Sequence, residues 1–247
     1  MTPNHSRCIH LLNPHSRLIA AFALAMFAAL AATAQSRRVF VPGQRAVVFD
    51  ERVSALRARP DVKAPLKQRM RRGRRVGVLG AAIGKDGAKF FRVAVSRNTR
   101  GWILSDAVVR PGVVADAEKL MTLIEQTEDE FTKARLAKLC ADEFRPTKFA
   151  PTALIILARA AEGSAERLSR DAKRRASDGE PNAGMRKRNF MLNDVGLDRY
   201  NRIGVTFDYD EAADRIVYDG AAYHELLRRY PRSAEARAAQ ARLNQNR

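Results

Sequence analysis

The stretch FFRVAVSRNTRGWILSDAVV, residues 90–109, decides the fold of the first half of the chain. In its first six residues, Phe91, Val93 and Val95 alternate with Phe90, Arg92 and Ala94, which predicts a strand with two different faces. The polar turn SRN (96–98) follows, and then Gly101 and Trp102, the only tryptophan of the chain, begin a second apolar run. The pattern predicts a hairpin of two antiparallel strands.

Short apolar runs separated by turn signals extend on both sides of this hairpin. Gly73, GKDG (84–87) and Gly101 mark turns or breaks between them. The predicted strands are RAVVF (45–49), RVSALRA (52–58), APLKQRM (64–70), RRVGVLG (74–80), FFRVAV (90–95), GWIL (101–104) and AVV (107–109). Strands this short and this regularly spaced are typical of a small barrel or sandwich, with the run at 64–70 paired to the run at 74–80 through the turn at Gly73.

These runs resemble the bacterial SH3-like (SH3b) domain. The matching residues are Leu56, Arg57 and Pro60 in the first element, Met70, Gly73, Val76, Val78 and Leu79 in the second, and Phe91, Val93, Gly101, Trp102 and Ile103 in the third. The family's usual Trp-Tyr pair is Phe90-Phe91 here, and Asn98 replaces a turn glycine, a change that the hairpin tolerates. The resemblance implies an SH3-like barrel over residues 35–112 that recognises cell-wall peptide or glycan, or a protein partner.

The second half has helical periodicity. Apolar positions in VADAEKLMTLIEQ (114–126) recur at i, i+3, i+4 and i+7, and a second helix is predicted in DEFTKARLAKLCADEF (129–144). A long helix or a broken pair follows from Pro151, and then a polar loop over 177–189. A β-hairpin is predicted in VTFDYDEAADRIVYDG (205–220), before two final helices that are separated at Pro231.

Two breaks between these helices are alike, because Phe144 and Tyr230 each precede a proline and a new alanine-rich helix. The second break resembles the tyrosine-proline corner of tetratricopeptide-like repeats, in which helices stack in pairs. We therefore expect an α+β protein of two domains. A small all-β SH3-like barrel (35–112) is followed by a mainly α-helical, tetratricopeptide-like domain with an inserted β-hairpin (113–247).

Residues 1–34 have the pattern of a signal peptide. LIAAFALAMFAALAATA (18–34) is uncharged and mostly apolar, and it ends in Ala32-Thr33-Ala34, a small-x-small motif. Cleavage after Ala34 predicts a periplasmic or secreted protein, whereas an uncleaved segment would anchor the chain in a membrane. After cleavage Cys140 is the only cysteine, so the mature chain has no internal disulfide.

The net charge of +18 is unevenly distributed. Residues 35–112 contain 19 Lys and Arg against 5 Asp and Glu, whereas residues 113–247 contain 24 against 22. An excess of this size predicts an anionic partner for the first half. The candidate ligand-binding residues are Trp102, Phe90, Arg69, Arg71, Arg72, Arg74 and Arg75, and the basic run KQRMRRGRR (67–75) is predicted to be solvated.

The chain lacks the residues that most catalytic chemistries require. After cleavage the chain has one cysteine and one histidine, His224, which excludes zinc sites built mainly from histidine and cysteine and leaves no plausible Cys-His pair. Cys140 is predicted to be a core residue, His224 a solvated helical residue, and DYDEAAD (208–214) a polar hairpin turn. We therefore expect no enzyme, catalytic site, metal site or cofactor.

The sequence favours an exported, non-enzymatic binding or scaffold protein of the cell envelope. Its partners would be a cell-wall polymer or an envelope protein, and the export signal argues against nucleic acid as a partner. Two alternatives stay open. One is a cell-wall hydrolase that uses two carboxylates, and the other is a polyanion-binding protein for nucleic acid or anionic lipid.

Overall fold

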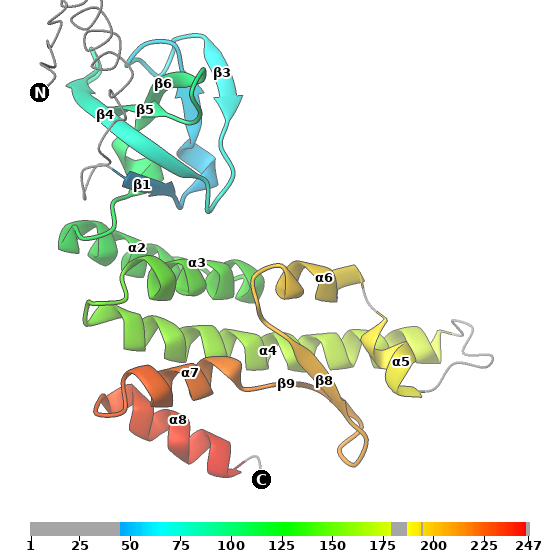
Figure 1. The fold of residues 1–247 in the computed structure, drawn as a ribbon. Coiled ribbons are helices and arrows are strands. Elements are labelled where there is room, and N and C mark those ends of the chain that lie inside the picture. Colours follow the sequence, from blue (N-terminus) through cyan, green and yellow to red (C-terminus); the bar gives the residue numbers. More distant parts are fainter. Residues whose placement is uncertain (1–44, 179–186, 194, 246–247) are drawn as a thin grey trace, which may run out of the picture. The chain divides into compact units, whose positions relative to one another are not determined.

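The structure is a computed structural model that describes residues 45–178, 187–193 and 195–245 (Figure 1). Over these ranges seven strands come first, and helices with one inserted hairpin follow, so the predicted order of β and α elements is confirmed. The predicted signal peptide, residues 1–34, lies outside the described residues. None of the helices in the described ranges combines the length and the apolar character of a membrane span.

Seven short strands and two 3-10 turns form the sheet region, residues 45–109. The strands are β1 Arg45–Val48, β2 Ala55–Arg57, β3 Leu66–Arg69, β4 Arg75–Ile83, β5 Lys89–Ala94, β6 Arg100–Leu104 and β7 Val108–Val109, and the turns are η1 Glu51–Val53 and η2 Ser105–Ala107. The run predicted as a strand over 52–58 is extended only from Ala55. It starts late because Asp50 accepts the backbone N–H of Arg52 at 3.0 Å and caps a helical turn there.

Neighbouring strands of the sheet pair antiparallel in the order β3-β2-β6-β5-β4-β1-β7. The strands β3 and β7 are edges, so the sheet does not close into the barrel expected from the sequence. The predicted pairing of 64–70 with 74–80 is also wrong, because β3 pairs with β2 while β4 pairs with β1 and β5. Gly73, at φ 81°, turns the chain away from the edge strand, and its N–H donates to the carbonyl of Val48 at 2.8 Å.

Two clusters of buried side chains stabilise the described chain. Alternation along β1 places Ala46 and Val48 in the cluster of the sheet region and Val47 in the cluster of the helices. The same alternation in β7 divides Val108 from Val109. Because single strands contribute to both clusters, the domain boundary after residue 112 stays a prediction.

The helical region, residues 114–245, contains α2 Val114–Gln126, α3 Glu130–Glu143, α4 Phe149–Ser177, α5 Lys187–Leu192, α6 Val195–Asn201, α7 Ala221–Arg229 and α8 Ala234–Gln245. The predicted helices over 114–126 and 129–144 are confirmed. The long helix α4 is continuous and holds Pro151 in its first turn, where a backbone N–H has no helical partner to lose. The predicted loop over 177–189 is wrong at its end, since Lys187 begins α5, where Phe190 and Met191 are buried.

The predicted hairpin is confirmed as β8 Phe207–Asp210 and β9 Arg215–Tyr218. It lies against α4, where the hydroxyl of Ser169 accepts the backbone N–H of Ile216 at 2.7 Å. The same oxygen is 3.3 Å from the carbonyl oxygen of Ile216, and the Ile216 side chain is buried. The Ser169 side chain thus fixes the outer edge of β9 to the helix.

Candidate functional site

A row of cross-strand neighbours crosses the sheet through Trp102. The strand register pairs Leu66 with Arg57, Arg57 with Trp102, Trp102 with Arg92, and Arg92 with Gly80. Directly paired residues lie on the same face of a sheet, so these five residues share one face over five strands. Trp102 is thereby placed between two arginines.

Gly101 explains why the tryptophan lies on this face. A Cβ at residue 101 would lie 2.7 Å from Leu56 Cγ and 2.8 Å from the Arg57 carbonyl oxygen, so only glycine lets β6 approach β2 this closely. Gly101 and Ile103 are buried on the core side, and Trp102 therefore points to the opposite side, where it is half-buried. Among the described residues, no second ring packs against the Trp102 ring and no cation lies over it.

Arg57 and Arg92 are cross-strand neighbours of Trp102, Arg100 lies two positions before it, and Lys67 reaches the carbonyl of Arg100. We call these five residues the Trp102 platform: Arg57, Lys67, Arg92, Arg100 and Trp102. The Arg57 guanidinium donates to the carbonyl of Ala64 at 2.8 Å, and the Lys67 ammonium donates to the carbonyl of Arg100, also at 2.8 Å. Within the described ranges, none of the four forms an ion pair with a carboxylate. Their charges are therefore available to an anion.

Phe90, the second predicted aromatic of the site, cannot contact a ligand directly. It lies on the same face as Arg92 but is fully buried. Its ring lies beneath the turn at Gly84, where a Cβ would come within 3.0 Å of the ring. Phe90 is therefore covered, and Trp102 is the aromatic of this face that solvent reaches.

The predicted basic run divides into residues with different environments, because β3 and β4 are not neighbours. Arg69 and Arg71 are exposed, and their guanidinium groups have no partner among the described residues. The Arg72 guanidinium, predicted to face solvent, is half-buried and donates to the Phe49 carbonyl at 2.7 Å, and burial lowers its pKa. Arg74 donates to the carbonyl of Val95 at 3.3 Å.

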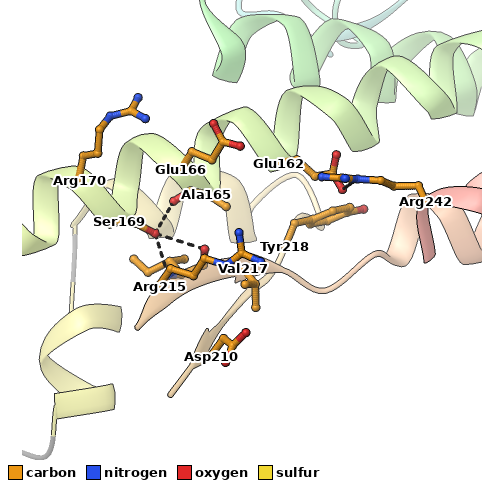
Figure 2. A pocket seen from close by; sticks show the side chains of 11 residues that line it. Glu162, Ala165, Glu166, Ser169, Arg170, Asp210, Arg215, Val217, Tyr218 and Arg242 are labelled. Carbon is orange, nitrogen blue, oxygen red and sulfur yellow. Dashed lines mark hydrogen bonds and ion pairs between the residues drawn. The ribbon is translucent and has the colours of Figure 1, made fainter. Parts of the chain in front are cut away.

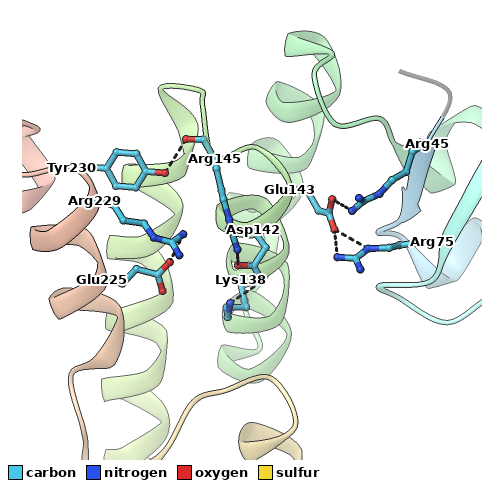
Figure 3. Close-up of polar contacts among 9 residues, drawn as sticks. All are labelled: Arg45, Arg75, Lys138, Asp142, Glu143, Arg145, Glu225, Arg229 and Tyr230. Atoms are coloured by element: carbon cyan, nitrogen blue, oxygen red, sulfur yellow. Dashed lines mark hydrogen bonds and ion pairs between the residues drawn. The ribbon is translucent and has the colours of Figure 1, made fainter. Parts of the chain in front are cut away.

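Arg75 of the predicted site is engaged by the helical region. Its guanidinium contacts Glu143 of α3 at 2.9 Å, and Arg45 of β1 contacts the other oxygen of the same carboxylate (Figure 3). The Glu143 side chain is only 6% exposed, so this pairing is structural, although the Arg75 side chain itself remains largely exposed. The structure therefore brings Trp102 together with Arg57, Lys67, Arg92 and Arg100, and not with Arg72, Arg74 or Arg75.

Sequence reasoning did not select these four basic residues, although part of the signal was present. Alternation in FFRVAV places Arg92 on the face opposite Phe91, and Arg100 is two positions before Trp102, on the same face. Arg57 lies on β2, which pairs with β6, and Lys67 lies on β3, which pairs with β2. No local sequence signal predicts either pairing. Arg57 and Lys67 could be found only once the strand order was known.

The candidate chemical groups of the helical region lie apart from one another. Cys140 is fully buried in α3, and desolvation raises the pKa of its thiol to about 12, while His224 is exposed on α7. In the 208–214 cluster, the Tyr209 hydroxyl and the Lys187 ammonium bind Asp214 and lower its carboxyl pKa to about 2. In the part of the chain that the structure describes, no group of three or more His, Cys, Asp or Glu could hold a metal ion.

Comparisons of the chain with protein-family models, with curated proteins and with solved structures find no match. The function is therefore inferred from the residues and contacts described above.

Proposed function

We propose that this protein is a non-catalytic binding protein of the cell envelope and that its Trp102 platform binds an anionic polymer, cell-wall peptide and glycan. The observation that carries the proposal is a half-buried tryptophan near four basic side chains that have no carboxylate partner in the described ranges. An aromatic face stacks on the apolar face of a sugar ring, and the cations attract carboxylates of the same polymer.

The export signal supports the envelope as the location of this partner. Its cleavage after Ala34 is part of the proposal, and an N-terminal sequence of the secreted or periplasmic protein that begins at Gln35 would agree with it. A secreted protein whose sequence begins at Met1 would contradict it.

The finer fold assignments belong to the same proposal. The strand pattern and the Gly101-Trp102 pair support an SH3-like origin for the sheet region, in the form of an open sheet. The two aromatic-proline corners support a tetratricopeptide-like origin for the helical region.

The experiment is a sedimentation assay of the purified protein with isolated cell walls, with nucleic acid and with anionic vesicles in parallel. We expect binding to walls at about 50 mM salt and its loss near 0.5 M, where the screening length falls to a few ångströms. The double variant Arg92→Gln/Arg100→Gln should weaken wall binding by about tenfold or more.

The matched control is Lys85→Gln/Arg97→Gln, which removes the same two charges from exposed turns of the sheet region. This control should bind walls almost as well as the unchanged protein. If both double variants weaken wall binding equally, binding depends on the overall charge of the sheet region and not on the platform. Preference for nucleic acid or vesicles would favour the polyanion-binding alternative, and release of sugar fragments from the walls would favour the hydrolase.

A further inference from the structure

A cleft of about 470 Å³ lies in the helical region between α4, the β8–β9 hairpin and α8 (Figure 2). Its volume falls within the range of small-molecule sites, about 300–1,000 Å³. Val217, which is half-buried, supplies apolar surface that a ligand can reach, and Tyr218 lines the side near α8. The walls of the cleft come from three separate segments of the chain, so no local sequence pattern indicates it.

The cleft is lined by equal numbers of positive and negative side chains, whereas the charges of the Trp102 platform are all positive. Three carboxylates and three guanidinium groups face it or border it: Glu162, Glu166, Asp210, Arg170, Arg215 and Arg242. Equal numbers of both signs give no general attraction for a polyanion. They suit a small ligand that itself carries both charges.

Half of these groups already have partners inside the protein. Arg242 pairs with Glu162 at 2.9 Å, and Asp210 accepts the backbone N–H groups of Ala212 and Ala213, each at 3.0 Å. Glu166, Arg170 and Arg215 have no polar partner among the described residues. The groups left for a ligand are thus one carboxylate and two guanidinium groups.

A peptide could bind here by adding a strand to β9 or through side chains alone, and the contact between the hairpin and α4 decides between these two modes. An extended peptide that added a strand to β9 would need the N–H and carbonyl of Ile216. The N–H is held by Ser169 at 2.7 Å, and the same hydroxyl oxygen is 3.3 Å from the carbonyl oxygen. A peptide in this cleft is therefore held by side chains and does not extend the hairpin.

We propose that this cleft binds a short peptide with a free amino group and two carboxylates. Glu166 takes the ammonium group, Arg170 and Arg215 take the carboxylates, and the apolar surface of Val217 accommodates a small aliphatic side chain. Charge-assisted hydrogen bonds of this kind are stronger than neutral ones, and guanidinium groups bind carboxylates through two parallel bonds.

The test uses the dipeptide alanyl-glutamate, which has one ammonium group and two carboxylates, and its N-acetyl form, which lacks the ammonium group. Calorimetric titration of the full chain should detect binding of alanyl-glutamate with a Kd below about 10 mM. Arg215→Gln should weaken the binding of both peptides by about tenfold. Glu166→Gln should weaken the binding of alanyl-glutamate to a similar extent and leave the affinity for the acetylated peptide unchanged.

Matched controls are Arg228→Gln on α7 and Glu118→Gln on α2, exposed residues that do not line the cleft. Both should bind alanyl-glutamate normally, as should the platform variant Arg92→Gln/Arg100→Gln. The proposal is overturned if folded protein does not bind the dipeptide, or if Glu166→Gln affects both peptides equally. Because the platform and its polymer do not enter this assay, either proposal can fail without the other.

Discussion

The hydroxyl of Tyr230 donates a hydrogen bond to the carbonyl oxygen of Arg145 at 2.8 Å (Figure 3). Tyr230 ends α7 before Pro231, and Arg145 lies between Phe144, which ends α3, and Pro146. The two corners that look alike in the sequence are therefore in direct contact. Buried Phe144 anchors the first corner, and Tyr230 joins the second corner to it.

The contact between the corners predicts a small loss of stability for Tyr230→Phe. The substitution removes one hydrogen bond and keeps the ring, so we expect the free energy of unfolding to fall by about 0.5–1 kcal/mol. Urea unfolding followed by circular dichroism measures the change. Tyr230→Leu, which also removes the aromatic ring, should cost more. An unchanged free energy of unfolding in Tyr230→Phe would show that the hydrogen bond contributes nothing.

Gly101→Ala should destabilise the protein by about 1–3 kcal/mol, because the new methyl group would overlap Leu56 and the Arg57 carbonyl. Gly80→Ala is the matched control. It is also a strand glycine, and a Cβ there would meet nothing within 4 Å. Thermal unfolding of the two variants should differ by several degrees, and identical melting temperatures would contradict the close approach of β2 to β6.

Trp102→Ala should lower the free energy of unfolding by about 1–2 kcal/mol, less than the 3–5 kcal/mol typical of a fully buried aromatic residue. The smaller cost follows from the half-buried position of Trp102 on the face opposite the core. Wall binding should be lost in this variant and largely retained in Trp102→Phe, which keeps an aromatic surface. A large loss of stability with normal wall binding would make Trp102 a core residue.

Burial of Cys140 predicts both low reactivity and a pH dependence. In a Cys8→Ser variant, iodoacetamide at pH 8 should label the folded protein on the order of a hundredfold more slowly than the protein in urea. The thiol pKa is raised from 9.0 to about 12 by burial. Its contribution to stability is therefore complete below pH 9 and is lost as the pH rises toward 12. Rapid labelling of the folded chain would contradict the burial.

Periodicity predicted the helices well because their buried positions are local in sequence. In α3, Leu136 and Cys140 lie on one stripe at i and i+4, and both are buried as expected. The hairpin at 207–218 was predictable for the same reason, as two short β-rich runs with a polar turn. Local spacing could not reveal that Ser169 fixes this hairpin to α4, because that contact joins residues 47 positions apart.

Strand order was the part of the fold that the sequence could not supply. The turn at Gly73 has the usual signal for a hairpin, yet the chain crosses from the edge strand β3 to β4 in the interior of the sheet. This crossing separates Arg69 from Arg75, and the pairing of β2 with β6 places Arg57 beside Trp102. Trp102 therefore lies beside arginines other than those of the predicted basic run, and its role in ligand binding stays a prediction.

The pairing of β1 with β7 has a consequence for folding during synthesis. Val47 and Val109 lie opposite each other, although they come from the two ends of the sheet region. A growing chain cannot complete this sheet until β7 has left the ribosome, just ahead of α2. Pairing β1 with β7 closes a loop that contains all the strands between them, and closing so long a loop is entropically costly. We therefore expect the hairpin β5–β6 to form early and the β1–β7 ladder to form last.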